Sequence, residues 1–212
     1  MIALKAQVLA CAQAMNASGI NRGSAGNVSV RYEEGFIVTP TGMDYARASP
    51  EDMVCVGMDG VVNMAQGTRK PSSEWRFHRD IYAARPEAGA IVHAHPPFAT
   101  SLACQGLEIP PFHYMIARFG GDTVRCAAYA TFGTQALSDA MLEALQDRSA
   151  CLMANHGMTV FGRDLEQALA HAIELEALCE QYWRVLQLGQ PRLLTAAQMA
   201  EALAKFSSYG QQ

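Results

Sequence analysis

The chain of 212 residues contains no run of the roughly 18 uninterrupted apolar residues that a membrane-spanning helix requires. This absence argues against a helical membrane protein. The N-terminal segment 1–19 is fairly apolar, but Gln7, Gln13 and Asn16 interrupt it, and only Lys5 precedes them as a basic residue. A secretory signal peptide has a basic start and an unbroken apolar stretch. We therefore expect a cytoplasmic protein.

Basic residues are not in excess either. The chain has 16 Lys and Arg residues against 20 Asp and Glu residues, a formal net charge of -4. Without a basic surface the protein has no electrostatic means of attracting nucleic acid or an anionic membrane, so we expect neither as a partner. A charged fraction of 17% and a hydrophobic fraction of 50% are typical of an ordinary globular protein.

Internal repeats, low-complexity tracts and linker-like breaks are also missing from the sequence. A chain of this length is long enough to bury one good core, and a second full domain would be unusual. We therefore expect one domain over residues 1–212.

The six cysteines form no CxxC pair, and most of them have apolar neighbours. Cysteines in this pattern are typical of reduced, packed thiols. They are Cys11, Cys55, Cys104, Cys126, Cys151 and Cys179.

Hydrophobic periodicity divides the chain into helices and short strands. Val8, Cys11, Ala12 and Met15 recur at helical spacing, and Gly19 follows them where a C-terminal cap belongs. The same reasoning predicts hairpins over 27–38 and 54–62, strands over 89–95 and 150–154, a helix from about 71 to 86, a helix capped by Thr134, a long helix over about 164–188, and a last helix from Thr195 and Gln198 to Lys205. Helices interspersed with hairpins and single strands indicate an α/β layered domain with a mixed sheet.

Two histidines two residues apart are the strongest chemical signal. Alternation along a strand turns His93 and His95 to the same face, about two residues' rise apart, which suits one metal ion. A single histidine in a strand is usually just packed or hydrogen-bonded. A pair that ends at Pro96-Pro97, where a strand would open into a site, favours metal binding.

A third metal ligand is predicted at His156, which follows an apolar strand and precedes Gly157, a residue that permits close backbone approach. Three protein ligands with an open position are typical of a catalytic zinc site. For His78 and His171, core or surface roles are the more ordinary interpretation.

Residues near the start of the helix that follows Pro71 could serve in proton transfer or anion binding. Glu74 lies in the first turn, where a carboxylate is ordinarily explained by the helix dipole. Ser72 and Ser73 lie at the helix N-terminus, where free backbone N–H groups could bind a phosphate group. The segments 24–27 and 39–42 have the composition of turns and, taken alone, could be no more than that.

Taken together, seven segments resemble the class II aldolase/adducin family. They occur in order and span nearly the whole chain, and the longest of them surrounds Glu74. The segments are GNVSV at 26–30, TPTG at 39–42, PSSEWRFH at 71–78, HAH at 93–95, HYMI at 113–116, YATFGT at 129–134 and NHG at 155–157.

The resemblance implies a three-layer α/β/α domain with a central mixed, largely antiparallel sheet. It also implies a fourfold-symmetric homotetramer with active sites at subunit interfaces. One Zn2+ ion per subunit would be bound by His93, His95 and His156, with Mn2+ or Co2+ as alternatives. Glu74 would be the acid/base, occupying the open position of the metal until substrate displaces it.

The resemblance assigns further roles to matched positions. Tyr114 would reach into the active site of a neighbouring subunit as the second proton-transfer group. The substrate phosphate would be held by Asn27, Thr41, Gly42, Ser72 and Ser73, and the aldehyde half would be enclosed by Phe132 and Tyr209.

The implied reaction is reversible cleavage of the C3–C4 bond of a deoxyketose 1-phosphate, which gives dihydroxyacetone phosphate and an aldehyde. The main expectation is a substrate like L-fuculose 1-phosphate, whose aldehyde product is lactaldehyde. The alternative is 5-deoxyribulose 1-phosphate or 5-methylthioribulose 1-phosphate, which differ only around the tail of the aldehyde. Close to the metal, the segment 96–98 matches no block of the family.

Other activities within the family rank lower. A methylthioribulose-1-phosphate dehydratase shares the histidines and the glutamate, and Tyr114 in its His-Tyr-Met setting favours the aldolase. Pentulose-phosphate 4-epimerases usually carry aspartate where this chain has Glu74. An adducin-like interaction module would lack the intact set of three histidines and the glutamate.

Overall fold

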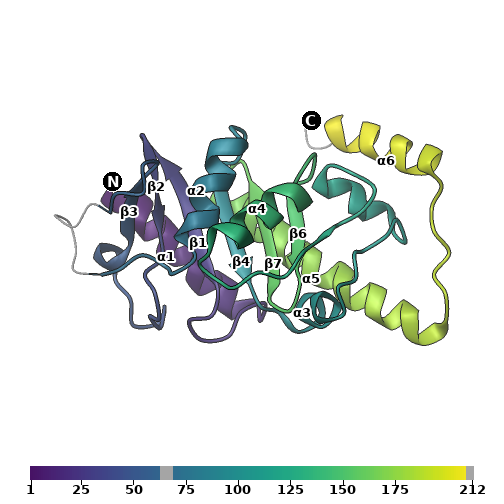
Figure 1. Ribbon diagram of the computed structural model, residues 1–212, viewed down its shortest axis with the longest axis horizontal. Helices are drawn as coiled ribbons and strands as arrows, with labels where there is room; N and C mark the ends of the chain where they lie inside the picture. Colours follow the sequence, from purple (N-terminus) through teal and green to yellow (C-terminus); the bar gives the residue numbers. More distant parts are fainter. Residues whose placement is uncertain (63–68, 209–212) are drawn as a thin grey trace.

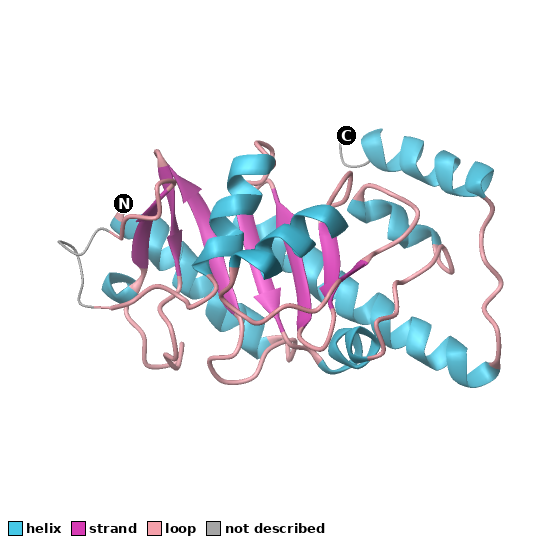
Figure 2. Ribbon diagram, in the orientation of Figure 1, coloured by secondary structure: helices cyan, strands magenta, loops and turns pink. Residues whose placement is uncertain are grey.

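A seven-stranded sheet lies between two layers of helices in the computed structural model, which describes residues 1–62 and 69–208 (Figures 1 and 2). The strand order is β3-β2-β1-β4-β7-β6-β5, and all neighbouring pairs are antiparallel except β5 and β6. This arrangement confirms the three-layer fold with a mixed, largely antiparallel sheet. The strands are β1 Asn27–Tyr32, β2 Gly35–Val38, β3 Val54–Gly57, β4 Ala90–Ala94, β5 Cys126–Ala127, β6 Ala150–Met153 and β7 Gly157–Gly162.

The helices are divided between the two faces of the sheet. Helices α2 (Trp75–Ala84) and α4 (Gln135–Ala144) cover one face, and α1 (Ile2–Ala17), α3 (Pro97–Cys104) and α5 (Leu165–Leu188) cover the other (Figure 1). The remaining elements are the 3-10 helices η1 (Pro50–Asp52) and η3 (Tyr114–Phe119) and the last helix, α6 (Ala196–Ser208). Helix α6 packs against η3 at the end of the molecule that lies on the right in Figure 1.

Two apolar cores follow from the alternation of side chains along the strands. On β4, Val92 belongs to the core shared with α1 and α5, whereas Ile91 belongs to the core shared with α2 and α4. His93 alternates with Val92 and therefore lies on the α2 face. The central strand thus carries a histidine into the layer that contains Glu74.

Most of the predicted elements are confirmed. Thr134 accepts a hydrogen bond from the backbone N–H of Leu137 and caps α4, and Asp164 caps α5 in the same way. Thr195 and Gln198 form the reciprocal contacts of a capping box at the start of α6. All six cysteines are free thiols, with Cys104 the exposed one. Among the described residues, no helix combines the length and apolar character needed to cross a membrane.

The structure departs from the sequence-based assignment in several places. Helix α2 begins at Trp75 rather than near residue 71, because the chain before it is extended against residues 39–41. The second arm of the hairpin over 54–62 is reduced to a single bridge between Val56 and Val62. The proline pair after His95 ends β4 but also begins α3. Strand β7, which starts directly after His156, was not predicted, because its residues continue the apolar run of β6 after only a short turn.

Candidate metal centre

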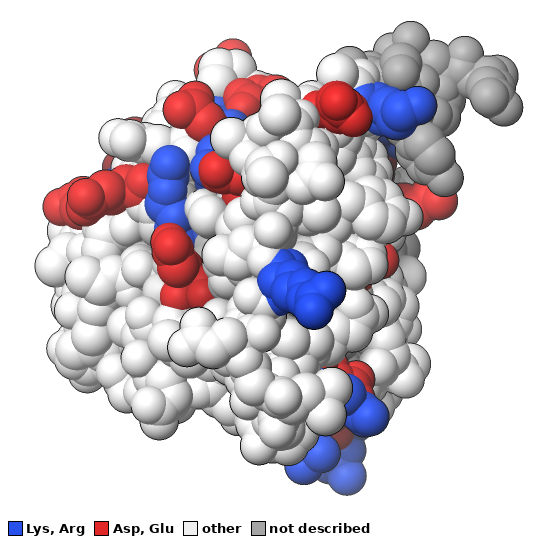
Figure 3. All heavy atoms as spheres, turned by 90° about the vertical axis from the view of Figure 1, so that its right-hand side faces the viewer, with Lys and Arg blue, Asp and Glu red and all other residues white. Residues whose placement is uncertain are grey.

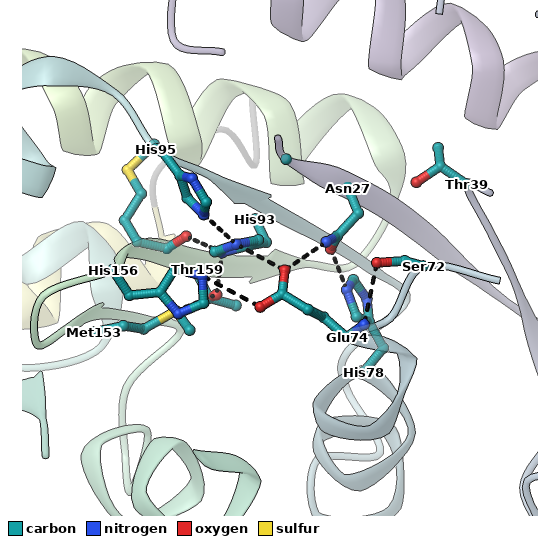
Figure 4. A network of polar contacts seen from close by, with 12 residues as sticks. Asn27, Thr39, Ser72, Glu74, His78, His93, His95, Met153, His156 and Thr159 are labelled. Carbon is teal, nitrogen blue, oxygen red and sulfur yellow. Dashed lines mark hydrogen bonds and ion pairs between the residues drawn. The ribbon is translucent and has the colours of Figure 1, made fainter. Parts of the chain in front are cut away.

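The predicted metal ligands are brought together by the register of three neighbouring strands. Strand β4 pairs with β1 on one side and with β7 on the other, so that Asn27 lies opposite His93 and Met158 lies opposite Ala94. His156 occupies the turn between β6 and β7, beside the end of β4. The N-terminus of α2, on one face of the sheet, adds Glu74, which lies below the histidines in Figure 4.

Three imidazole rings face one another at this point. Each of His93, His95 and His156 offers a ring nitrogen, and these nitrogens all lie within 4.8 Å of one another. The Nε2 atoms of His93 and His95 are 2.9 Å apart. His93 is completely buried, and the other two rings are partly buried.

The tautomer of His93 follows from its partners. Its Nδ1 atom lies 2.9 Å from the main-chain oxygen of Met158 and 3.2 Å from Oγ1 of Thr159. A carbonyl oxygen can only accept, so Nδ1 carries the proton and donates it. When the ring is neutral, the lone pair of Nε2 points into the cluster, which is the arrangement found when a second hydrogen bond orients a metal-binding histidine.

The Glu74 carboxylate closes the cluster. It is buried, with Oε2 3.1 Å from Nε2 of His93 and Oε1 3.2 Å from Nε2 of His156. Burial alone would raise the pKa of this carboxyl, but the nearby His93 and the contact with His156 outweigh it and hold the pKa well below its ordinary range. Oε1 is buried yet makes no contact with hydrogen-bond geometry.

These observations fit a divalent cation. Nε2 of His93 faces Nε2 of His95 and Oε2 of Glu74. These three atoms can all accept a hydrogen bond, and a cation placed between them would offset their repulsion. Three imidazole nitrogens and a carboxylate are ligands suited to zinc and related divalent ions. Oε1 of Glu74, which has no hydrogen bond, is the atom that such an ion would satisfy. His93, His95 and His156 would hold the cation.

Gly157 lets His95 approach the other rings. A Cβ atom at this position would lie 2.5 Å from the main-chain oxygen of Ala94 and 2.7 Å from the ring of His95. The close backbone approach predicted for this glycine is therefore present. Burial, together with the neighbouring His93 and His156, lowers the pKa of His95 to about 3, which favours the neutral ring that a metal requires.

A second layer of polar contacts extends from Glu74 into the interior. Oε2 of Glu74 accepts a hydrogen bond from Nδ2 of Asn27 (3.0 Å), and Oδ1 of Asn27 lies 2.5 Å from Nε2 of His78 (Figure 4). Nδ1 of His78 contacts Ser29, which in turn contacts the hydroxyl of Tyr82.

The sequence-based assignment gave His78 and Ser29 no role, although a spacing signal was available. Ser29 follows Asn27 by two residues on one face of a strand, and His78 follows Glu74 by four residues on one face of a helix. Both pairs therefore face the same interlayer space.

The residues predicted to bind phosphate divide into two groups. The segments 39–42 and 70–73 lie side by side, since Ser72 N–H donates to the oxygen of Thr39 and Thr41 N–H donates to that of Lys70. Thr41, Gly42 and Ser73 are exposed there, and Ser72 is buried against the N–H of Glu74. These four residues surround the start of α2. The side chain of Asn27 is instead held by Glu74 and His78.

Of the residues predicted to enclose the aldehyde half or to take part in the second proton transfer, Phe132 and Tyr114 lie at the surface. Phe132 is 64% exposed in a loop that Arg76 ties to α2 by donating to the oxygen of Gly133 (2.7 Å). Tyr114 is 54% exposed, and its ring contacts are with His113 and, on α6, Phe206. Tyr209 lies outside the described residues.

The fold and the histidine cluster together define an enzyme with a divalent-metal site. Residues 6–183 match the family described as "Class II Aldolase and Adducin N-terminal domain", and the chain belongs to that family. Within this family the protein is an aldolase, because its relatives are named aldolases. Aldolases are lyases.

Three relatives illustrate the range of similarity. The 5-methylthioribulose-1-phosphate/5-deoxyribulose-1-phosphate aldolase of Rhodospirillum rubrum is 49% identical over 99% of this chain and 93% of its own. The L-fuculose phosphate aldolase of Escherichia coli K12 is 41% identical over 98% of this chain and 95% of its own. A solved structure of an L-fuculose 1-phosphate aldolase has a TM-score of 0.92 at 34% identity, covering 96% of this chain and 95% of that one.

Metal analysis tests the histidine cluster directly. We expect His95→Ala to weaken zinc binding strongly, because it removes a metal ligand. The loss of affinity should exceed the roughly 10–100-fold that follows when a residue hydrogen-bonded to a ligand is removed. His171→Ala is the matched control, because His171 is also buried but lies on α5 outside the cluster. Competition with a zinc-binding dye gives both affinities. Equal affinities for the two variants would contradict the assignment of His95.

The buried His78 predicts a pH dependence of stability. Burial lowers its pKa to about 3, against 6.5 in an exposed chain. Below pH 6.5 the unfolded chain therefore binds a proton that the folded protein excludes, so the free energy of unfolding falls as the pH falls, whereas the stabilisation is complete above 6.5.

We expect the metal-free wild type to lose up to about 1.4 kcal/mol per pH unit more than His78→Gln between about pH 6.5 and pH 5. Urea unfolding in the presence of a chelator measures the two slopes. Parallel slopes would show that His78 is not held in its neutral form.

Proposed function

We propose that the protein cleaves 5-deoxyribulose 1-phosphate or 5-methylthioribulose 1-phosphate to dihydroxyacetone phosphate and a two-carbon aldehyde. The observation that carries the chemistry is the buried Glu74 carboxylate, in contact with His93 and His156 and with one oxygen free of hydrogen bonds. The products would be acetaldehyde from the first substrate and methylthioacetaldehyde from the second. The reverse reaction would join the same two molecules.

This proposal revises the main expectation from the sequence, which was a substrate like L-fuculose 1-phosphate. The relative named for 5-methylthioribulose and 5-deoxyribulose 1-phosphates is 49% identical, against 41% for the L-fuculose phosphate aldolase of E. coli K12. Most of the segments used to recognise the family contain the residues assigned to the metal and to the phosphate, and the phosphate group is common to all of these substrates. They carry little information on the tail of the aldehyde, so the overall identity supports the 5-deoxyribulose and 5-methylthioribulose 1-phosphates.

The three histidines would hold one divalent cation, for which Zn2+ is our expectation. When bound, the cation would supply a Lewis acid that offsets the negative charge developing on the C2 oxygen of the ketose as the C3–C4 bond breaks. The neutral ring of His95 suits this role, because it does not have to lose a proton before it binds the cation.

Glu74 would transfer the proton at C3: in the synthetic direction the ionised carboxylate removes it, and in the cleavage direction Glu74 first takes up a proton from solvent, which replaces the one released from the C4 hydroxyl, and delivers it to C3. After cleavage, that carbon carries the electron pair of the broken bond and needs a proton to become the hydroxymethyl carbon of dihydroxyacetone phosphate. A carboxylate acts as acid and base only if its geometry is held close to the reacting carbon. The hydrogen bond from Asn27 to Oε2 holds the group, and Oε1 makes no hydrogen bond, although it lies 3.2 Å from Nε2 of His156.

The phosphate would bind at the start of α2. Exposed residues of the segments 39–42 and 70–73 surround the helix N-terminus, where backbone N–H groups favour an anion. Thr41, Gly42, Ser72 and Ser73 are the residues that we assign. The proposed phosphate role of Asn27 is supported by the family resemblance alone, since its amide is already bonded at both ends.

Tyr114 would take the proton from the C4 hydroxyl in the active site of a neighbouring subunit. In its own chain it contacts α6 and is half exposed, which leaves its hydroxyl available to a partner. The adjoining end of the molecule presents few charged side chains (Figure 3), and the end of α5 and the segment after it expose Trp183, Leu188 and Leu193. A surface of this kind suits contact with another subunit. We therefore propose a homotetramer with shared active sites, where Phe132 and Tyr209 line the aldehyde half.

A cleavage panel tests the choice of substrate. We expect kcat/KM for the 5-deoxyribulose and 5-methylthioribulose 1-phosphates to exceed that for L-fuculose and L-rhamnulose 1-phosphates by about tenfold or more. The physical reason is that lactaldehyde brings a further hydroxyl group, which costs free energy in a pocket that does not pair it. Dihydroxyacetone phosphate is measured with a coupled reductase.

Two results of the panel would count against the proposal. A higher kcat/KM for L-fuculose 1-phosphate would return the assignment to that substrate. Loss of water from 5-methylthioribulose 1-phosphate without release of dihydroxyacetone phosphate would identify a dehydratase.

Mixing two inactive variants tests the shared active site. Glu74→Gln should keep the metal and lose most turnover, because it removes proton transfer without removing a histidine. Tyr114→Phe should be impaired for a different reason, since the other proton transfer fails. If each site combines Glu74 of one chain with Tyr114 of another, co-refolded mixtures should regain part of the activity through sites that contain both native residues. Mixtures no more active than the average of the two variants would exclude sharing.

A further inference from the structure

A continuous line of buried hydrogen bonds leads from Glu74 to the core of the α2 layer. It runs from Oε2 of Glu74 to Asn27 (3.0 Å), from Asn27 to His78 (2.5 Å), from His78 to Ser29 (2.7 Å) and from Ser29 to the hydroxyl of Tyr82 (2.8 Å). The part from Glu74 to His78 is visible in Figure 4. All of these side chains are at most 5% exposed.

The direction of each hydrogen bond in this line is determined by the carboxylate. An ionised carboxylate only accepts, so Asn27 presents its amide nitrogen to Glu74 and its oxygen to His78. Nε2 of His78 must then carry the proton, and Nδ1 must accept from the hydroxyl of Ser29. Ser29 in turn accepts from Tyr82. Every donor points towards Glu74.

The opposite tautomer of His78 would break the line. With the proton on Nδ1, Nε2 would be an acceptor, and the Asn27 amide would have to turn its nitrogen towards His78. The oxygen of Asn27 would then face Oε2 of Glu74, so that two acceptors would meet in a buried site. The ring of His78 therefore decides which way the Asn27 amide points.

We propose that His78 is a positioning residue for proton transfer by Glu74, acting through the amide of Asn27. It holds Oε2 as an acceptor and leaves Oε1 as the oxygen that exchanges the proton with the substrate carbon. This inference rests on the proposed aldolase function, because it names the group that orients the acid/base of that site.

The line is suited to orientation and not to carrying protons to solvent. It ends at Tyr82, which is itself buried at 2% exposure beneath the guanidinium of Arg31. A proton that moved along it would have no exit to water. Burial raises the pKa of Tyr82 and lowers that of His78, so both stay neutral at ordinary pH and the direction of the hydrogen bonds is retained.

Two amide substitutions separate the two nitrogens of the ring. His78→Gln places an amide nitrogen where Nε2 lies and can still donate to Asn27, whereas His78→Asn reaches only the Nδ1 position near Ser29. Both are uncharged and polar, but asparagine is one methylene group shorter than glutamine and leaves the larger void, so the unfolding free energies of the two variants are compared as well. His171→Gln is the control for replacing a buried histidine outside the line.

The measurement compares metal-loaded proteins of equal metal content. The first readout is the exchange of the hydroxymethyl C–H proton of dihydroxyacetone phosphate with solvent deuterium, in which Glu74 removes the proton and returns a deuteron. The second is kcat and KM for cleavage. We expect His78→Asn to lower the exchange rate and kcat by about 10–100-fold, with a smaller change in KM. His78→Gln should stay closer to the wild type than His78→Asn, and His171→Gln should match the wild type.

Nitrogen-15 spectra of the imidazole groups provide a readout that does not need turnover. The signal that disappears in both His78 variants should show a slowly exchanging proton on Nε2 and none on Nδ1. A proton on Nδ1 would refute the direction of the line. Equal losses in the Gln and Asn variants, or no loss in either, would overturn the positioning role.

The outcomes also separate this inference from the assignment of the substrate. Wild-type protein that exchanges the proton of dihydroxyacetone phosphate but cleaves neither 5-substituted pentulose phosphate would refute only the substrate, since the variants are still compared by exchange. Wild-type protein that does neither would overturn both proposals.

Discussion

The candidate site depends on the pairing of one strand. Strand β4 is hydrogen-bonded to β1 and to β7, and this double pairing places Asn27 beside His93 and the β6–β7 turn beside His95. Side chains alternate along a strand, so a shift of β4 by one residue would turn both histidines to the α5 face. The buried apolar residues between them and on either side, such as Val92 and Ala94, make that shift costly because they fill the opposite core.

The site concentrates electron-rich atoms where water is excluded. Nε2 of His93 lies 2.9 Å from Nε2 of His95 and 3.1 Å from Oε2 of Glu74. Such an arrangement is unfavourable unless a cation or protons neutralise it. Local instability of this kind is typical of functional sites, and the surrounding sheet and helix α2 provide the rigid support that it requires.

The polar groups around the cluster orient the His93 ring and the Glu74 carboxylate. Met158 and Thr159 determine the tautomer of His93, and Asn27 with His78 holds one oxygen of Glu74. The proposed phosphate residues lie beside the segment that leads into the helix that carries Glu74, so the proposed phosphate site and the proposed acid/base would share one support. Tyr114 stands apart on η3 against α6, and this separation is the reason why the proposed reaction needs a second chain.

Much of this was accessible from the sequence because the signals were local. The spacing of His93 and His95, the cap at Thr134 and the hairpin over 27–38 depend on neighbours within a few residues, and so does the family resemblance around Glu74. The start of α2, the short strand β5 and the strand β7 depend on pairing with distant segments, which periodicity does not encode. The sequence by itself pointed to the three histidines that the fold brings together and to the class of chemistry. Only the tertiary structure decided the tautomers and the role of His78, because a hydrogen-bond direction is set by partners that lie about fifty residues away in the chain.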